Sequence, residues 1–209
     1  MKAKEIYNVL IKKYPNAESE LDYSSNFELL VAVILSAQCT DKRVNQVTKV
    51  LFEKYYKPEH FAKLSQQELE KLIYSCGFYH NKAKNIISAS KQIVDEFNGE
   101  VPNNLVDLQK LAGVGRKTAN LVYSLVFGGD AIAVDTHVFR TSNRLGLSNS
   151  KNVLDCEKDL MKSIPKNLWS KMHFLLVLFG RYQCKSHRPL CENCEFKSFC
   201  KYYNNLINH

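Results

Sequence analysis

The sequence predicts an all-α protein, and three observations support this fold class. Apolar residues recur at helical spacing in successive segments, and helix caps and glycines separate these segments. No two stretches show the alternation expected of paired strands. With 209 residues, of which 45% are hydrophobic, the chain can bury one large core or two small ones.

Capping signals place the helices along the chain. Ser25 and Glu28 have the spacing of a capping box, as do Ser65 and Glu68. The helix behind Ser25 is apolar nearly all round and should therefore be buried. Outside the central hairpin, helices are expected over residues 1–15, 27–37, 41–56, 66–76, 81–97, 136–145, 150–164 and 167–179.

Two helices joined by a tight hairpin are predicted over residues 103–112 and 116–127. The hairpin comprises Gly113, Val114 and Gly115. Its glycines permit positive φ and leave the backbone amides open to an anion, at a helix N-terminus that favours a phosphate. We interpret the hairpin as a phosphate-binding site. An ordinary turn, in which the glycines only cap the helices, is the alternative.

Lys117 is a candidate nucleophile. It lies in the first turn of the second hairpin helix, where the helix dipole and the neighbouring Arg116 both disfavour an ammonium ion. We therefore expect its amine to lose a proton more easily than a surface lysine, as Schiff-base chemistry requires. The alternative is that Lys117 and Arg116 both contact phosphate.

Asp135 follows the apolar run at residues 131–134, which should hold its carboxylate in place and partly desolvate it. Such a carboxylate can serve catalysis. It can also cap a helix that begins at Thr136. The two roles are compatible, because a capping carboxylate keeps one oxygen for another partner.

The C-terminal cysteines indicate a metal site. Their pattern is C-x6-C-x2-C-x5-C, formed by Cys184, Cys191, Cys194 and Cys200. Clustered thiolates require a metal, since free ones would repel one another and oxidise. Zinc sites usually pair two C-x2-C motifs, and this chain has one, so the spacing favours an iron-sulfur cubane over zinc.

Basic residues between the first two of these cysteines would project from the bound metal and could contact phosphates or offset the charge of the cluster. They are Lys185, His187 and Arg188. The other cysteines are isolated in apolar segments and are expected to behave as small buried hydrophobic residues. They are Cys39, Cys76 and Cys156.

Charge indicates a polyanionic partner, because the net charge is +8 and the sequence pI is about 9.0. The N-terminal segment lacks the apolar core of a signal peptide. The longest apolar run, residues 27–35, contains Glu28 and is too short to span a bilayer. We therefore expect an intracellular protein with no secretion signal or transmembrane segment.

Three motifs resemble the endonuclease III family of helix-hairpin-helix DNA glycosylases. They are FELLVAVILSAQCTD from Phe27, LAGVGRKTAN from Leu111 and VDTH from Val134. With the cysteine pattern they cover nearly the whole chain. The resemblance implies an all-α, two-domain helix-hairpin-helix DNA glycosylase fold with a cleft between the domains. A six-helix domain would span residues 22–130, and residues 1–21 and 131–209 would form a discontinuous domain carrying a [4Fe-4S] cluster on the four cysteines.

The resemblance also implies roles for individual residues. Lys117 would attack the sugar C1′ with help from Asp135. Gln38 and Phe78 would fill the gap that an extruded nucleotide leaves in the DNA stack. The apolar wedge of the family is commonly leucine, so Phe78 is a departure. A phenyl ring could still stack between bases, or Phe78 could instead pack two helices together.

We therefore expect a bifunctional DNA glycosylase and AP lyase of base excision repair. It would release oxidised pyrimidines and cleave the abasic site by β-elimination through a lysine Schiff base. Its partner would be double-stranded DNA containing damaged bases or abasic sites, bound by a monomer at the cytoplasmic nucleoid. The alternatives are a monofunctional adenine-mismatch glycosylase, disfavoured by Lys117, a non-catalytic DNA-binding protein, and an electron carrier.

Overall fold

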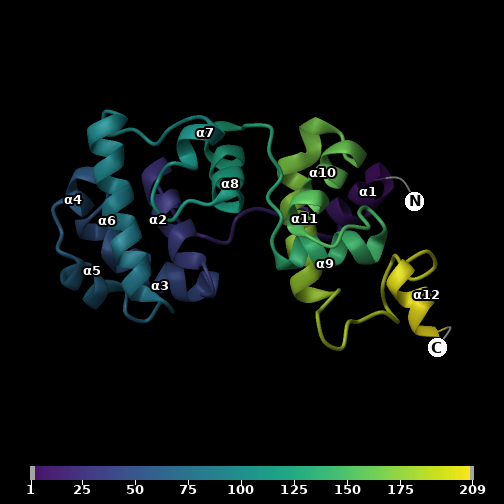
Figure 1. Ribbon diagram of the computed structural model, residues 1–209. Coiled ribbons are helices and arrows are strands. Elements are labelled where there is room, and N and C mark those ends of the chain that lie inside the picture. Colours follow the sequence, from purple (N-terminus) through teal and green to yellow (C-terminus); the bar gives the residue numbers. More distant parts are fainter. Residues whose placement is uncertain (1–2, 208–209) are drawn as a thin grey trace. The chain divides into compact units, whose positions relative to one another are not determined.

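The computed structural model describes residues 3–207, and every regular element in that range is a helix (Figure 1). The predicted all-α class is therefore confirmed for the described residues. Met1 and Lys2, which the sequence places in the first helix, lie outside them, as do residues 208–209. The chain divides into two compact units. We call Ser19–Gly129 the hairpin unit, and Met1–Glu18 with Asp130–His209 the cysteine unit.

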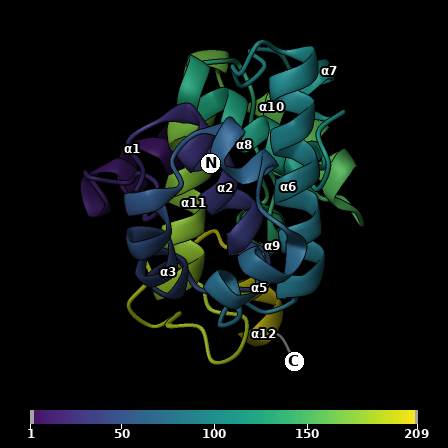
Figure 2. The same ribbon diagram turned by 90° about the vertical axis from the view of Figure 1, so that its left-hand side faces the viewer.

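The hairpin unit is built around two helices, α2 and α6. The long helix α6 contacts α2, α4 and α5, and α2 also contacts α3 and α8 (Figure 2). The helices of this unit are α2 (Asn26–Ser36), α3 (Asp41–Lys54), α4 (Pro58–Ala62), α5 (Gln66–Ile73), α6 (Tyr79–Glu96), α7 (Leu105–Leu108) and α8 (Arg116–Phe127).

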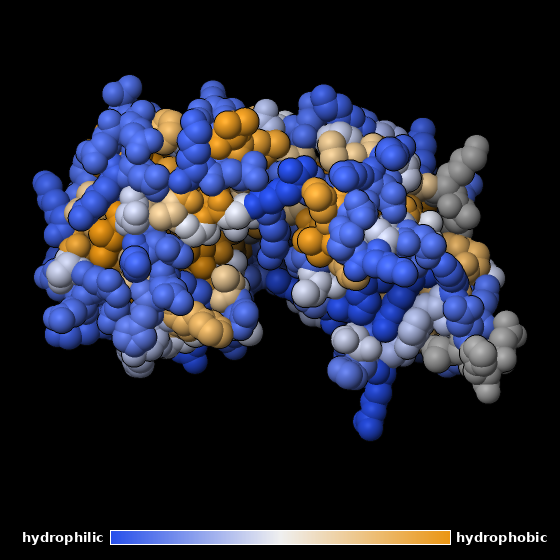
Figure 3. Space-filling model, in the orientation of Figure 1, coloured by the Kyte–Doolittle hydropathy of each residue, from blue (hydrophilic) through white to orange (hydrophobic). Residues whose placement is uncertain are grey.

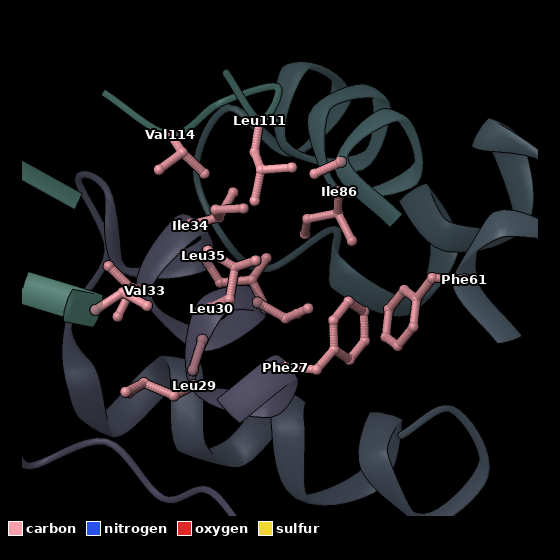
Figure 4. Close-up of a cluster of buried hydrophobic side chains, with 14 of the residues drawn as sticks. Phe27, Leu29, Leu30, Val33, Ile34, Leu35, Phe61, Ile86, Leu111 and Val114 are labelled. Atoms are coloured by element: carbon pink, nitrogen blue, oxygen red, sulfur yellow. The ribbon is translucent and has the colours of Figure 1, made fainter. Parts of the chain in front are cut away.

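Helix α2 is the centre of the core, as its sequence predicts, because residues 27–35 are all buried. The Phe27 ring packs edge-on against Phe61, with 5.4 Å between centroids. Leu111 and Val114, from the segment between α7 and α8, also point into this cluster (Figure 4). Burying each large apolar side chain contributes about 1.5–3 kcal/mol. The hairpin is therefore fixed to the core by its own apolar residues.

One predicted capping box is present and the other is only half formed. Ser65 Oγ accepts a hydrogen bond from Glu68 N, and Ser65 N donates to the Glu68 carboxylate at 2.8 Å. Ser25 Oγ likewise accepts from Glu28 N at 3.2 Å. The Glu28 carboxylate, however, accepts from Ser24 N at 2.6 Å. The Glu28 carboxylate thus accepts from the backbone N–H of Ser24 instead of that of Ser25, the donor expected in a capping box. The buried carboxylate therefore still has a hydrogen-bond partner.

Several short helices differ from the sequence prediction. Helix α4 is not predicted, because five residues beginning at Pro58 are too few to show a helical period. Helix α7 has only four residues and ends well before Ala112, where turns take over. Helix α12 (Lys201–Ile207) follows Cys200 directly and is also not predicted.

The cysteine unit joins the beginning and the end of the chain. Its central helix is α11, which is largely buried and contacts both α1 and α9. Helix α9 also contacts α10 and α12. The helices of this unit, besides α12, are α1 (Ala3–Lys13), α9 (Thr136–Leu145), α10 (Val153–Ser163), a 3-10 turn (Lys166–Leu168) and α11 (Trp169–Tyr182).

The surface is mainly hydrophilic on the face shown in Figure 3. This agrees with a chain in which 24% of the residues are charged. The hydrophobic residues visible on that face form smaller areas between polar ones. None of the helices in the described part of the chain combines the length and the apolar character needed to cross a membrane.

Candidate functional site

The hairpin between α7 and α8 alternates exposed glycines with one buried valine. Val114 is 4% exposed, and its N–H donates to Leu111 O at 3.0 Å. Gly113 and Gly115 are exposed on either side of it. Gly113 has φ +77°, and a Cβ atom there would lie 2.8 Å from Cβ of Asn85 on α6. Glycine is therefore required at position 113 by backbone conformation and by space.

The N-terminus of α8 is open to a ligand. Its N-cap is Gly115, which has no side chain to accept a hydrogen bond from the first turn. The orphan amides and the helix dipole together favour an anion at this position. Arg116 and Lys117 follow directly, and both side chains are exposed. The structure thus brings together the features expected of an anion-binding site, with an amine in the same helical turn.

Gln38 and Phe78 lie on two neighbouring junctions of the hairpin unit. Gln38 has φ +51° between α2 and α3, and Phe78 has φ +58° at the start of α6. A Cβ atom on Gly77 would lie 3.5 Å from Gln38 O, so the two backbones approach closely. Left-handed conformations at residues other than glycine are strained and recur at functional sites.

The side chain of Phe78 points to solvent. It is 63% exposed, which is high for an aromatic residue. The alternative in which Phe78 packs two helices together is therefore wrong. The exposed ring is instead compatible with a residue that contacts a ligand.

Asp135 caps α9 as predicted. Its Oδ1 accepts a hydrogen bond from Val138 N at 2.7 Å, and the side chain is half-buried. The preceding residues 131–134 are all buried. His173 of α11, itself 5% exposed, lies with Nδ1 2.8 Å from Ala133 O. These contacts hold the segment that carries Asp135. Asp135 belongs to the cysteine unit, whereas Lys117 belongs to the hairpin unit.

His137 is the second residue of α9 and lies near Asp135. Burial lowers the pKa of His137, and the nearby guanidinium groups of Arg140 and Arg181 lower it further, against the opposing effect of Asp135. The imidazole is therefore held towards its neutral form. Its Nδ1 lies 3.2 Å from Nη2 of Arg140.

The four C-terminal cysteines line one pocket of the cysteine unit, together with apolar side chains that include Leu145 and Phe179. Burial raises the pKa of Cys194 to about 11. Burial and the neighbouring thiols of Cys184 and Cys200 raise the pKa of Cys191. The donor set suits a thiolate-bound cluster. Among residues 3–207, however, no three His, Cys, Asp or Glu side chains are arranged to hold a metal ion.

Two arginines of α9 hold the loop that begins at Cys184, and the sequence interpretation missed both. Arg140 donates to Cys184 O at 3.1 Å and to Gly180 O at 2.9 Å. Arg144 donates to Lys185 O at 2.7 Å and has Nη1 3.5 Å from Sγ of Cys184. Their spacing of four residues, which places both on one helix face, is the signal that could have identified them.

The basic residues between Cys184 and Cys191 are exposed, as predicted. They are Lys185, His187 and Arg188, and Arg188 has φ +48°. Arg144 contacts the carbonyl groups of this loop and stacks on Tyr202, with Cζ 3.8 Å from the ring centroid. The hydrogen bonds from Arg144 therefore fix the backbone of this basic loop.

The remaining cysteines follow the prediction only in part. Cys76 and Cys156 are fully buried. Cys39 is partly exposed. Burial raises the pKa of Cys76 to about 11, and the nearby thiol of Cys39 raises it further. The expectation of a small buried residue was wrong for Cys39, because the short apolar helix ends three residues before it, at Ser36.

Comparison with known proteins identifies the family. The model of the HhH-GPD superfamily base excision DNA repair proteins matches residues 31–166. Endonuclease III of Bacillus subtilis (strain 168) is 53% identical over 189 residues, which cover 90% of this chain and 86% of that protein. Endonuclease III of Escherichia coli (strain K12) is 41% identical over 198 residues, covering 95% and 94%.

A solved structure of a trapped endonuclease III–DNA covalent intermediate superimposes with a TM-score of 0.93. It is 47% identical in sequence, and the match covers 99% of both chains. Fold, hairpin and cysteine loop together define a helix-hairpin-helix enzyme of DNA repair. The chain belongs to the HhH-GPD superfamily of base excision DNA repair proteins and, within it, to the endonuclease III family. It is a DNA glycosylase and AP lyase of base excision repair.

Gly113 and Gly115 should respond differently to alanine. Gly113→Ala should lower the free energy of unfolding by about 1–2 kcal/mol for the left-handed backbone alone, and the approach to Asn85 adds to this. Gly115→Ala should change it by less than about 0.5 kcal/mol, because an added Cβ meets nothing within 4 Å. Urea unfolding of the two variants measures both values. Equal stability of the two would contradict the hairpin geometry.

Arg144→Met should loosen the loop after Cys184. Methionine keeps an apolar stem over Tyr202 but removes the donors to the loop carbonyls. Each lost hydrogen bond costs about 1 kcal/mol, so trypsin should cut after Lys185 roughly tenfold faster. Lys162→Met on the exposed side of α10 is the matched control. Unchanged cleavage of Arg144→Met would show that other contacts hold the loop.

Proposed function

We propose that this enzyme releases oxidised pyrimidines from double-stranded DNA and then cleaves the abasic site by β-elimination through a Schiff base on Lys117. The observation that carries the proposal is the exposed Lys117 amine in the first turn of α8, directly beside an uncapped helix start. The site that binds a backbone phosphate and the nucleophile thus share one helical turn. The protein acts as a monomer on damaged DNA of the nucleoid.

The hairpin binds the DNA backbone through main-chain groups. Gly115 presents no side chain, so a phosphate can approach the amides at the start of α8 closely. Val114 contributes only as an anchor, because its side chain is buried and its N–H already donates to Leu111 O. Arg116 supplies positive charge at the same position. Phosphate contacts of this kind position the duplex without reading its sequence.

Gln38 and Phe78 fill the gap left by the extruded nucleotide. The support for this role is that both are exposed and both adopt left-handed conformations on adjoining junctions. An aromatic ring can occupy the space between base pairs as an apolar wedge, and Gln38 can form hydrogen bonds with the unpaired base. The projection of Lys185, His187 and Arg188 contacts phosphates elsewhere on the strand.

The chemistry divides between Lys117 and Asp135. The neutral amine of Lys117 attacks C1′ and forms a C–N bond while the base departs with the electron pair of the glycosidic bond. Asp135 stabilises the positive charge that develops on the sugar and helps to move protons. The C1′–O4′ bond then breaks, O4′ takes up a proton, and the adduct becomes a Schiff base, which allows loss of the 2′ proton and departure of the 3′ phosphate. Asp135 can take part because Oδ1 alone serves the helix cap.

The cysteine quartet holds a [4Fe-4S] cluster. Four thiols lining a single pocket, with uneven spacing in sequence, support this assignment. When bound, the cluster would cross-link the loop from Cys184 to Cys200. Arg140 and Arg144 then fix the same loop from the side of α9.

Lys117→Gln should abolish trapping of a covalent adduct when borohydride is added to the enzyme and abasic-site DNA. The amide lacks the amine that forms the Schiff base. DNA binding, measured by fluorescence anisotropy, should fall only slightly, because the hairpin amides are unchanged. Lys91→Gln, an exposed lysine of α6, is the control for loss of one charge. Full trapping by Lys117→Gln would assign the nucleophile to another residue.

Asp135→Asn should slow base release by about 10²-fold, the size typical for one preorganised electrostatic group. Lyase action on a preformed abasic site should fall less, because the positive charge of base departure no longer has to develop. Asparagine caps helices as well as aspartate does, so the melting temperature should hardly change. A variant that unfolds, or one with wild-type base release, would make Asp135 a structural residue only.

Anaerobically purified protein should be yellow-brown and contain roughly four iron and four sulfide per chain. Replacing Cys194 by alanine should remove the iron and increase proteolysis of residues 184–200. Metal analysis and absorption spectra measure the first effect. Stoichiometric zinc in the native preparation would instead indicate that the same four cysteines form a zinc site.

A further inference from the structure

Lys82 is a buried lysine whose side chain ends at the C-terminus of another helix. It belongs to α6 and is only 4% exposed. Its Nζ donates to Leu35 O of α2 at 2.8 Å, and the two helices pack against each other (Figure 2). Burial lowers the pKa of Lys82, against the opposing effect of the nearby thiols of Cys39 and Cys76. Burying an amine costs free energy that an exposed lysine avoids, so this position calls for an explanation.

The carbonyl group that Lys82 binds is one that α2 leaves open. In a continuing helix, Leu35 O would accept from the backbone N–H of residue 39. Helix α2 ends at Ser36, however, and Cys39 N donates to Ser36 O at 3.1 Å. The last turn of α2, residues 33–36, contains no basic residue to stabilise the negative end of the helix dipole. Lys82 therefore supplies both the missing donor and positive charge from α6.

The same residue is bonded to the start of α6. Lys82 N donates to Phe78 O at 3.1 Å, and Phe78 is the N-cap of α6 with φ +58°. Gln38, two residues beyond the end of α2, has φ +51°. A Cβ atom on Gly77 would lie 3.5 Å from Gln38 O, so a shift of one junction would displace the other. Lys82 thus connects the two places where the backbone is left-handed.

Such conformations need support from their surroundings. At residues other than glycine they cost free energy, and they persist only where neighbouring structure imposes them. The hydrogen bond from Lys82 attaches the last turn of α2 to α6, just before the chain turns at Gln38. Without it, Leu35 O would be a buried acceptor that has lost its donor. The end of α2 could then relax, and the backbone of Gln38 would no longer be held.

We propose that Lys82 is a positioning residue for base release, whose bond to Leu35 O holds the Gln38 and Phe78 junctions in the arrangement that fills the gap left by the extruded nucleotide. The effect on base release rests on the function proposed above for Gln38 and Phe78. Lys82 is buried, so it acts through these two residues and not by contact with DNA.

The two reactions of the enzyme depend differently on the gap-filling residues. Extruding a damaged nucleotide from a duplex requires unstacking, which inserted side chains offset. An abasic site in single-stranded DNA has neither a base to extrude nor a stacked gap to fill. Loss of the Lys82 amine should therefore slow base release from duplex DNA, whereas general damage to the fold would slow both reactions.

The first test measures the junctions directly by hydrogen exchange of the full-length protein. Lys82→Met removes the amine and keeps an apolar stem of similar length. Peptides covering residues 36–41 and 74–82 should exchange about fivefold faster than in the wild type. Lys84→Met, at an exposed lysine of the same helix, is the matched control and should leave exchange unchanged. Unchanged exchange at both junctions of Lys82→Met, or an equal increase throughout the hairpin unit, would overturn the proposal.

The second test measures single turnovers on duplex DNA that contains an oxidised pyrimidine. Lys82→Met should release the base about tenfold more slowly than the wild type, because small displacements of positioning groups are costly in rate. Cleavage of an abasic site in single-stranded DNA should change less than about twofold, as should binding to undamaged duplex, since the hairpin amides are unaffected. An equal loss in both reactions would make Lys82 a residue of general stability and would overturn the proposal.

A double-mutant cycle shows whether Lys82 acts through the gap-filling residues. In a protein that already carries Gln38→Ala and Phe78→Ala, adding Lys82→Met should slow base release less than about twofold further, because the effects of coupled residues do not add. A further tenfold loss would reveal an independent effect and overturn the proposal. Melting temperatures show which variants are folded. Lys82→Gln, which keeps a donor on a shorter side chain, replaces Lys82→Met in both tests if the latter does not fold.

Failure of the proposed function would be visible separately. Wild-type base release by the protein carrying Gln38→Ala and Phe78→Ala would refute the gap-filling role, and with it the effect of Lys82 on the rate. Absence of borohydride trapping by the wild type would refute the Schiff base on Lys117. Hydrogen exchange depends on neither activity, so it decides in every case whether Lys82 holds the two junctions.

Discussion

Burial of α2 is the constraint on which the hairpin unit depends. Residues 27–35 contact other elements on every side, so α2 has no freedom to rotate or slide within the core. Its C-terminal end therefore delivers Gln38 and Cys39 to a fixed place. The same buried cluster receives Leu111 and Val114, which fix the hairpin. The Gln38 junction and the hairpin thus owe their positions to one buried apolar helix.

Helix α9 has the corresponding position in the cysteine unit. The carboxylate of Asp135 caps the first turn of α9. Arg140 and Arg144 of the same helix donate hydrogen bonds to the loop that begins at Cys184. The acid and the basic projection are therefore attached to one rigid element. The half-buried guanidinium of Arg140 donates to carbonyl groups and lies beside His137, which explains how a charge is tolerated there.

Local signals predicted much of this structure. The bounds of α8 and the caps formed by Ser65 and Asp135 follow from short-range rules that the sequence displays directly. Elements of four or five residues, such as α4 and α7, are too short for a period to predict their extent. The close approach of Gly77 to the backbone of Gln38, and the left-handed, exposed state of Phe78, arise from packing between distant segments. No local pattern contains that information.

The two units differ in when they can fold during synthesis of the chain. The hairpin unit is continuous, so it can fold as soon as its last residue, Gly129, has left the ribosome. Helix α1 contains the buried residues Ile6 and Leu10 and contacts α11, which is made after the whole hairpin unit. The apolar face of α1 therefore stays uncovered while most of the protein is being made. The cysteine unit can therefore complete its core only after α11 has been made.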